Sequence, residues 1–241
     1  MDEKRIIWVI GFPKSGNTWL SYLIAYISNL PYHDFADLAI RPKKKIVRDL
    51  VSGQLNHPKI SGFDFVYKSH KTLRVLPVKE QDFVIYIYRD PRDLYISYRH
   101  FMKNKFSGWK GRMVWRFHAL FGSRHLIKWL FKRQYSHIKH WNPRADFLLS
   151  YEDLQLNSYK LLLNIFNRIG PIEDETIHAG VKAFSFKSLS EGRDQGKEDK
   201  GSFYRKGIVG DWEKSLTERE IDLYKSMNVN HLIDNIKKKE C

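Results

Sequence analysis

A glycine-rich segment near the amino terminus, GFPKSGNTW, has the residue types of a phosphate-binding loop. Three of its positions, Gly11, Gly16 and Thr18, match the nucleotide-binding pattern G-x-x-x-x-G-K-S/T. Asn17, however, stands where that pattern has its lysine, and the lysine of this segment, Lys14, comes three residues earlier. Because the pattern lysine reaches the β- and γ-phosphates of ATP, the displaced Lys14 indicates a phosphate site built for a different donor.

The loop offers two kinds of hydrogen-bond donor to an anion. A strand, a glycine-rich loop and a helix N-terminus together direct backbone N–H groups at a bound phosphate. Ser15, Asn17 and Thr18 add side-chain donors. At its shifted position the Lys14 ammonium can meet the atom that bridges the donor's phosphate and the transferred group, where its charge stabilises the leaving group without a metal. The alternative is a loop that only turns the chain, with Lys14 in solvent.

Other chemically capable side chains follow apolar segments elsewhere in the chain. Arg89 follows FVIYIY, His70 follows FDFVYKS, and Tyr151 ends DFLLSY. An imidazole titrates near neutral pH, as a general base should, so His70 is the candidate that takes a proton from an acceptor. Lys68 lies two residues before His70, on the same side of an extended chain, and is a candidate for stabilising the charge of the transferred group.

The pattern of apolar residues predicts the elements that carry these side chains. Apolar runs indicate buried strands, and a helical periodicity separates them. This alternation predicts a P-loop-type α/β fold of three layers, with a central parallel sheet flanked by helices. Ligands collect beyond the carboxyl ends of such strands, so one crevice is expected to hold Lys14, His70, Arg89 and Tyr151. The expected strands are 6–10, 63–68, 83–88 and 146–151, with a helix over 18–28 and a mobile loop over 191–203.

Composition limits the class of protein. The chain has 241 residues, enough for one sizeable domain, which is predicted to span 1–241. The formal net charge is +15, and 94–145 contains no Asp or Glu, so an anionic partner is expected. No apolar run has the length of a transmembrane helix. The single cysteine, Cys241, favours a reducing compartment and a cytoplasmic location. No cluster of His, Cys, Asp or Glu has metal-ligand spacing, so no metal is predicted.

Three segments resemble motifs of the cytosolic-type sulfotransferases, which use 3′-phosphoadenosine 5′-phosphosulfate (PAPS) as donor. PKSGNTW is similar to the family's PKSGTTW loop, and FYRKGIVGDW is similar to its RKGxxGDW motif. YRDPRDLYISYRHF resembles its 3′-phosphate motif, in which an arginine and a serine eight residues later bind the phosphate. The resemblance implies PAPS as co-substrate and 3′-phosphoadenosine 5′-phosphate (PAP) as product. It also implies a set of residues at the 3′-phosphate: Arg89, Ser97, Arg205, Lys206 and Gly207.

The same resemblance implies the rest of the donor site. It assigns the loop residues 14–18 to the 5′-phosphosulfate and places Trp19 and Tyr151 beside the adenine. Phe186 corresponds to a further neighbour of the adenine, although the family's Thr-Ser-Phe reads Phe-Ser-Phe here. Both Trp19 and Tyr151 have the alternative of being ordinary core aromatics.

The base is implied in the same way. The tripeptide Lys68-Ser69-His70 is similar to the family's Lys-Thr-His, with serine in place of threonine. The resemblance implies His70 as general base, with Lys14 and Lys68 as the other catalytic residues. The expected reaction is in-line transfer of a sulfuryl group from PAPS to a hydroxyl or amine, by analogy with phosphoryl transfer.

The acceptor and the partners are less constrained. A small molecule, a glycan or a lipid is expected, and an anionic acceptor would suit the basic composition. The stretch 112–135 predicts a helix that packs on the domain, or, as the alternative, one that lies on an anionic membrane. The family's KxxxTVxxxE dimerisation motif is absent, which leaves the oligomeric state open.

Two other classes of protein are alternatives to the sulfotransferase interpretation. The first is a magnesium-dependent P-loop phosphotransferase, with Asp90 holding the metal. Asn17 in the lysine position and the RKG segment argue against it. The second is a polyanion-binding module, which the charge and the tryptophans favour. No nucleic-acid-binding motif is present, so no specific nucleic acid is expected.

Overall fold

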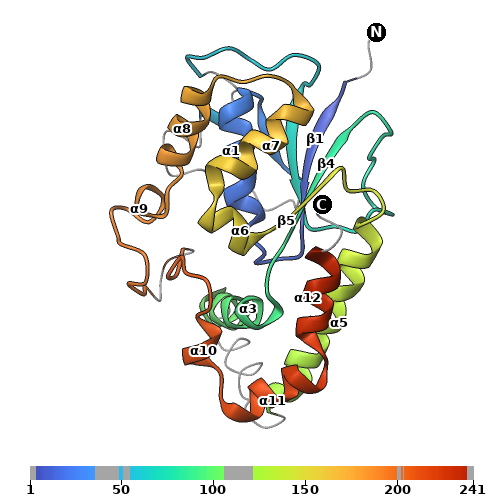
Figure 1. The fold of residues 1–241 in the computed structure, drawn as a ribbon, viewed down its shortest axis with the longest axis vertical. Helices are drawn as coiled ribbons and strands as arrows, with labels where there is room; N and C mark the ends of the chain where they lie inside the picture. The colour runs from blue at the N-terminus through green and yellow to red at the C-terminus, as the bar shows by residue number, and fades with distance from the viewer. Residues whose placement is uncertain are drawn as a thin grey trace.

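A five-stranded sheet forms the centre of the molecule (Figure 1). Its strands are β1 (Ile6–Ile10), β2 (Tyr32–Asp34), β3 (Phe65–Ser69), β4 (Phe83–Tyr88) and β5 (Phe147–Ser150). They lie in the order β2-β3-β1-β4-β5, and every neighbouring pair is parallel. The chain therefore builds the sheet on one side of β1 and then crosses to the other. This computed structural model describes residues 4–35, 49–50, 55–105, 122–199, 202 and 204–237.

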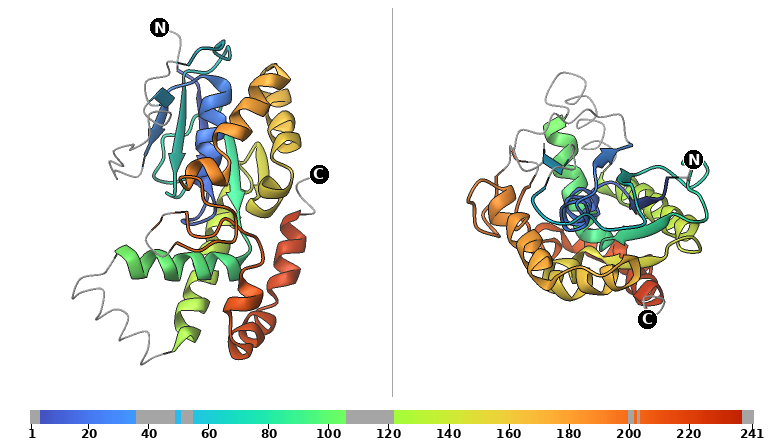
Figure 2. Two further views of the ribbon diagram at one scale, coloured as in Figure 1. Left: turned by 90° about the vertical axis from the view of Figure 1, so that its left-hand side faces the viewer. Right: turned by 90° about the horizontal axis from the view of Figure 1, so that it is seen from above.

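Helices cover both faces of the sheet, because successive side chains of a buried strand alternate between its faces. Ile7 and Val9 of β1 enter one hydrophobic core, and Trp8 and Ile10 enter the opposite one. The predicted three-layer α/β fold is thus confirmed (Figures 1 and 2). The first core includes residues of α1 (Asn17–Ser28), α6 (Tyr151–Leu156), α7 (Ser158–Ile169), α8 (Asp174–Ala183) and α9 (Phe186–Leu189), and the second includes residues of α5 (Ser123–Trp141) and α12 (Val229–Lys237).

A third hydrophobic core lies beyond the carboxyl ends of the strands. It joins α3 (Pro91–Lys105), α10 (Trp212–Ser215) and α11 (Glu218–Ser226) to α5 and α12. Leu94 of α3 is fully buried in this core, and so is Ile127 of α5. Figure 2 shows α3 crossing beneath the sheet. The strand ends therefore face a layer of helices instead of open solvent.

Two of the four predicted strands have the expected bounds. The strands expected over 6–10 and 83–88 are confirmed as β1 and β4. The strand expected over 63–68 begins and ends slightly later, as β3, because Phe65 is the first residue to pair with β1. The strand β2 was missed, since three residues are too few to show an alternating pattern.

Two element ends follow from local hydrogen bonding. The helix expected over 18–28 begins one residue earlier and ends before Asn29, which adopts a left-handed conformation with a φ of 52°. The strand expected over 146–151 stops at Ser150. There the Ser150 hydroxyl accepts the Asp153 N–H at 3.0 Å and caps α6, so the chain turns into a helix at the strand's end.

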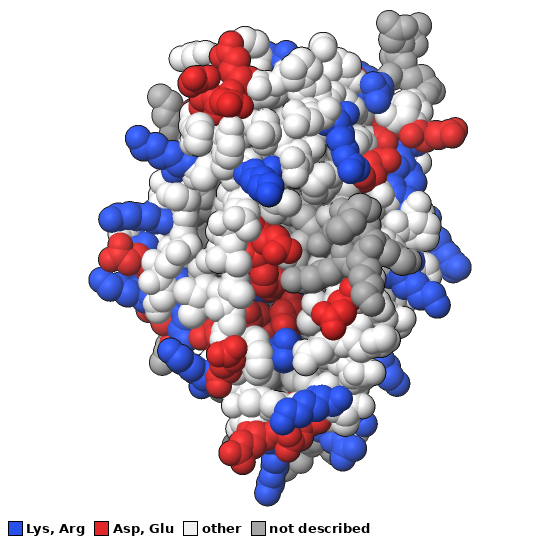
Figure 3. All heavy atoms as spheres, in the orientation of Figure 1, with Lys and Arg blue, Asp and Glu red and all other residues white. Residues whose placement is uncertain are grey.

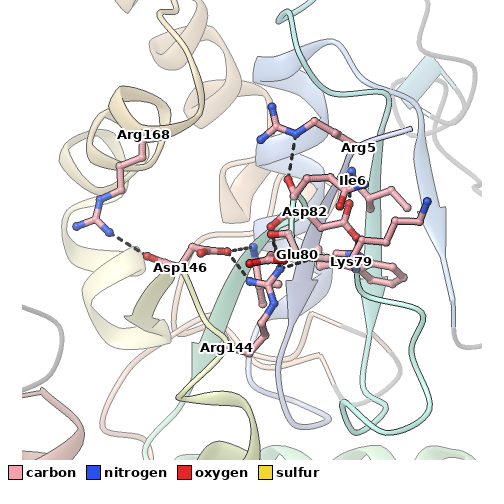
Figure 4. A network of polar contacts seen from close by, with 11 residues as sticks. Arg5, Ile6, Lys79, Glu80, Asp82, Arg144, Asp146 and Arg168 are labelled. Atoms are coloured by element: carbon pink, nitrogen blue, oxygen red, sulfur yellow. Dashed lines mark hydrogen bonds and ion pairs between the residues drawn. The ribbon is translucent and has the colours of Figure 1, made fainter. Parts of the chain in front are cut away.

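A buried polar network holds the amino ends of the strands together (Figure 4). Asp82, which is 3% exposed, accepts hydrogen bonds from the Ile6 N–H and the Trp8 indole N–H, both at 2.9 Å. The Arg144 guanidinium connects the residue before β4 to the residue before β5. It donates to the Asp82 carbonyl at 2.9 Å and to the Asp146 carboxylate at 3.0 Å. The network fixes β1, β4 and β5 against one another at the edge opposite the expected crevice.

Replacing Asp82 with alanine should lower the free energy of unfolding by about 2–4 kcal/mol, because the buried Trp8 N–H loses its acceptor. Urea unfolding measures this loss. Asp222→Ala is the control, since Asp222 and its partner Lys225 are both 71% exposed, and it should cost less than about 0.5 kcal/mol. Equal losses in the two variants would contradict the role assigned to Asp82.

Candidate active site

The loop between β1 and α1 lies at the carboxyl ends of the central strands, because β3 and β4 flank β1. Lys14 and Gly16 both have left-handed backbone, with φ of 74° and 98°. The Ser15 N–H donates to the Phe12 carbonyl at 3.1 Å and closes the turn. A Cβ on Gly16 would lie 2.6 Å from the Tyr151 ring, so this position requires glycine. The tight loop leads into the N-terminus of α1, an arrangement that favours anion binding.

Asn17, in the position of the usual lysine, ties the loop to its neighbour strand. Its amide nitrogen donates to the Gly11 carbonyl at 3.0 Å and to the Ser69 carbonyl at 3.3 Å, and the side chain is buried. From the sequence, this amide is predicted to donate to an anion. In the structure the amide N–H groups are used within the chain, so Asn17 shapes the loop.

His70 lies just past the end of β3 and contacts the same loop. Its Nδ1 is 2.8 Å from the Gly11 carbonyl. A carbonyl only accepts, so Nδ1 carries the proton and Nε2 is the unprotonated nitrogen of the neutral ring. Burial, followed by the charge of Lys68, lowers the pKa of His70 from 6.5 to about 4. The ring is therefore neutral at pH 7, with Nε2 able to accept a proton.

Lys14 lies among other cations. Its Nζ is 4.8 Å from the centre of the Phe101 ring in α3. Burial lowers the pKa of Lys14 from 10.5 to about 8, and nearby positive charges add to this effect: those of Arg89, Lys68 and Arg205. Cations that are far apart in the sequence thus act on one another at the strand ends. Such a cluster favours a bound polyanion.

Lys68 has a carboxylate partner that the sequence analysis did not find. Its Nζ is 2.7 Å from Asp34, and both side chains are largely buried. Asp34 belongs to β2, and it pairs in register with Lys68 of β3. The partnership depends on strand pairing, which no local sequence pattern reveals.

Arg89 stands at the end of β4 with its guanidinium 4.2 Å from the centre of the Tyr151 ring. Its Nη atoms lie 3.5 Å from the carbonyls of Lys14 and Ile208, so the side chain bridges the first loop and the RKG segment. The sequence also offers Arg89 a salt bridge to a neighbouring aspartate, Asp90 or Asp93, as the alternative to a phosphate contact. Asp90 instead pairs with Arg92.

A nearby aspartate, Asp93, holds the GDW part of the FYRKGIVGDW segment. Its carboxylate accepts the Gly210 N–H at 2.7 Å and the Trp212 N–H at 2.9 Å. Asp93 is 1% exposed, and burial raises its pKa despite the opposing charge of Arg89. The segment after β4 and the distant GDW segment are therefore joined, although they are more than a hundred residues apart.

Arg205 and Lys206 share one carboxylate. Asp211 pairs with the Arg205 guanidinium and with Lys206 Nζ, the latter at 2.8 Å. Glu198 contacts Arg205 as well, at 3.1 Å. Burial opposes the ionisation of Asp211, but hydrogen bonds from both cations outweigh it and lower its pKa. Glu198 lies in the segment 191–203, whose described residues, 191–199 and 202, form neither helix nor strand.

The three aromatic side chains predicted to contact the adenine are Trp19, Tyr151 and Phe186. Trp19 and Tyr151 meet edge to face with ring centres 5.9 Å apart, and the Trp19 indole donates to the Phe184 carbonyl at 2.8 Å. Phe186 packs so closely on Gly207 that a Cβ there would lie 2.1 Å from its ring. The predicted adenine neighbours thus lie against the PKSGNTW loop and the RKG segment.

Two predicted residues have less defined surroundings. Ser97 lies in α3 and Thr18 is the second residue of α1, and both are half-buried. Their elements carry them to the same end of the sheet as the loop. Among the described residues, neither hydroxyl has a distinguishing contact.

Several buried polar atoms at or beside the site have no hydrogen-bond partner among the described residues. Ser15 Oγ and Arg89 Nε are donors of this kind, and they suit phosphate or sulfate oxygens. The others are acceptors: Asn17 Oδ1, Gln134 Oε1 and Gln155 Oε1. The two unpaired donors fit an anionic ligand such as the PAPS phosphates.

The magnesium-dependent alternative is not favoured by the geometry. Asp90, its proposed metal ligand, accepts hydrogen bonds from both the N–H and the guanidinium of Arg92. Within the part of the chain that the structure describes, no group of three or more His, Cys, Asp or Glu side chains is arranged to hold a metal.

Comparison with known proteins identifies the family. A sulfotransferase domain profile matches residues 4–235. Sulfotransferase 2A1 of Macaca fascicularis is 25% identical, over 97% of this chain and 85% of that protein. Sulfotransferase 2A1 of Homo sapiens is 26% identical, over 90% of this chain and 79% of that protein. Cytosolic sulfotransferase 13 of Arabidopsis thaliana is 26% identical, over 88% and 72% of the two chains.

Solved structures show the same fold. Mouse sulfotransferase SULT7A1 complexed with PAP has a TM-score of 0.66 at 18% identity, covering 99% of this chain and 89% of that one. Retinol dehydratase in complex with androsterone and PAP has a TM-score of 0.60 at 18% identity, covering 97% and 81%. The chain therefore belongs to the sulfotransferase family, and its reaction is sulfuryl transfer from PAPS.

We expect the affinity for PAP to fall as the pH rises above about 8. Lys14 is cationic below its pKa of about 8 and neutral above it, and a bound polyanion favours the cationic form. The complex therefore takes up a proton, and the dissociation constant should rise by up to about tenfold per pH unit. Calorimetric titration between about pH 7 and about pH 9.5 measures the slope.

Lys14→Arg is the matched control, because a guanidinium stays charged over this range. Its PAP affinity should be nearly independent of pH there. A slope that persists unchanged in Lys14→Arg would show that a group other than Lys14 titrates.

Proposed function

We propose that the residues at the strand ends divide into a transfer centre and a phosphate clamp. The transfer centre consists of Lys14, Lys68 and His70. The observation that carries this proposal is His70 itself: its Nδ1–H is held by the Gly11 carbonyl, which makes Nε2 the basic atom, and the ring contacts the loop that carries Lys14. PAPS supplies the sulfuryl group and a good leaving group.

In the proposed reaction, His70 Nε2 accepts the proton of the acceptor's hydroxyl or amine as the new bond to sulfur forms. The bond between sulfur and the bridging oxygen breaks, and its electron pair stays on the 5′-phosphate of PAP. Lys14 stabilises the charge that develops there, and Lys68 stabilises the sulfuryl oxygens. The bound donor's negative charge opposes the cations that depress the pKa of His70, so it makes His70 a stronger base.

The proposed clamp holds the 3′-phosphate. Arg89 and Arg205 offer planar forks that suit a phosphate dianion, with Lys206, the Gly207 backbone and Ser97 beside them. Arg89 already contacts the carbonyl of Ile208 in the RKG segment, so the two motifs are adjacent. The proposed loop contacts to the 5′-phosphosulfate come from 14–18. Trp19, Tyr151 and Phe186 form the proposed adenine side of the site.

The proposed acceptor is a small molecule with a hydroxyl or amine. Relatives support both groups: one structural neighbour is in complex with androsterone, and an amine sulfotransferase of Oryctolagus cuniculus is 22% identical over 90% of this chain. An anionic glycan or lipid is the alternative class. Figure 3 shows lysine and arginine spread over this face, with acidic groups between them, so this view gives no single basic patch for such an acceptor.

The expected helix over 112–135 lies partly in α5, and 112–121 lies outside the described residues. Within α5, Ile127 and Leu130 are buried in the protein, as in the packed-helix alternative, whereas Trp129 is 45% exposed. Peripheral membrane contact through this surface is a secondary proposal. None of the described helices is long and apolar enough to cross a bilayer. A single domain over 1–241 and a cytoplasmic location complete the proposal, the latter supported by the cytosolic relative from Arabidopsis.

Transfer of label from radiolabelled PAPS to a panel of phenols, hydroxysteroids and amines tests the function. The rate should persist in EDTA, since no step requires a metal. His70→Gln should lower kcat by roughly 10²- to 10⁴-fold, with PAP affinity unchanged. His140→Gln, at an exposed site on α5, should be as active as wild type. Transfer that requires magnesium, or a fully active His70→Gln, would contradict the proposed chemistry.

A further inference from the structure

Three polar side chains occupy the buried face of α5. Gln134, His137 and Trp141 are separated by three and four residues, so they lie on one side of the helix. Gln134 is 1% exposed and His137 is 6% exposed. Burying polar groups costs free energy unless they are hydrogen-bonded. On a packed helix face, these side chains therefore require specific hydrogen-bond partners.

The partners are backbone carbonyls just beyond two strand ends. Gln134 Nε2 donates to the Arg89 carbonyl at 2.6 Å, directly after β4. His137 Nε2 lies 3.3 Å from the carbonyls of His70 and Lys71, directly after β3. Trp141 donates to the Lys71 carbonyl at 3.1 Å. One helix face thus holds the backbone of the base and the backbone of the clamp arginine.

The tautomer of His137 follows from its neighbours. Because Nε2 faces two carbonyls, it carries the proton, and Nδ1 of the neutral ring accepts from the Tyr86 hydroxyl at 2.8 Å. Tyr86 is fully buried in β4. Burial also lowers the pKa of His137, which keeps the ring neutral. The ring therefore links β4 to the residues after β3 with a fixed donor and a fixed acceptor.

We propose that His137 is a positioning residue that sets the place of the His70 base, and that Gln134 sets the place of Arg89. The proposal rests on the roles given to His70 and Arg89 in the proposed function. His70 is then held at two points, with its ring on the Gly11 carbonyl and its backbone on His137. Neither α5 residue contacts reacting atoms in this account.

The two α5 positions should have different kinetic effects. His137→Phe keeps an aromatic ring but loses the hydrogen bonds to Tyr86, His70 and Lys71, so the base shifts. We expect kcat to fall roughly ten- to hundredfold, with the PAP dissociation constant within about twofold of wild type. Gln134→Leu should instead weaken PAP binding by about tenfold and leave kcat within about threefold.

Two further variants separate positioning from packing. His137→Gln keeps an amide donor for the carbonyls and should recover much of the lost kcat. Tyr86→Phe retains the ring but removes the hydroxyl that holds Nδ1 of His137, so it should lower kcat in the same direction as His137→Phe. Lys139→Ala, at an exposed position of α5, is the control and should match wild type in rate and melting temperature.

Steady-state kinetics, PAP calorimetry and thermal melts on these variants decide the question. A kcat effect at position 137 and a binding effect at position 134 support the proposal. Parallel losses of kcat, PAP affinity and melting temperature in both variants would overturn it, as would wild-type kcat in a folded His137→Phe or in Tyr86→Phe. Failure of the wild-type chain to bind PAP would instead refute the proposed function on which the inference rests.

Discussion

Repulsion between cations is the constraint on which the site depends. The fold brings Lys14, Lys68 and Arg89 to adjacent strand ends, where burial, together with the neighbouring cations, lowers the pKa of Lys14. Carboxylates offset part of this charge: Asp34 pairs with Lys68, and Asp211 pairs with both cations of the RKG segment. A polyanionic donor would relieve the remaining repulsion. In the proposed function, the same charges that destabilise the site by itself are the source of its selectivity for a bisphosphorylated nucleotide.

Hydrogen bonds to strand-end carbonyls turn this charge cluster into a defined geometry. The Gly11 carbonyl accepts from both Asn17 and His70, so the loop after β1 and the proposed base share one anchor. The carbonyls after β3 and β4 accept from α5. Backbone groups past the end of a strand lack ladder partners and need others. Here they find them in side chains from distant parts of the chain, which couples the order of the site to the packing of the helices.

The sequence was sufficient for the fold class and for the residues that meet at the strand ends. Apolar runs define β1 and β4, and a parallel sheet must gather whatever follows its strands. It was not sufficient for the partners of those residues. Asp34 lies in a strand too short to recognise, and Asn17 was predicted to face an anion although its N–H groups serve the loop. The polar contacts of α5 were also not predicted. Their partners are backbone carbonyls, which every residue has, so no sequence pattern identifies them.

The most direct test of this account is thermal stabilisation of the chain by PAP, compared with ADP in the presence and absence of magnesium. PAP at a hundred times its dissociation constant should raise the free energy of unfolding by about 2.7 kcal/mol without any metal. Arg205→Ala should weaken this effect, because it removes a cation from the proposed clamp for the 3′-phosphate. Stronger stabilisation by ADP with magnesium than by PAP would contradict a site selected for the 3′-phosphate.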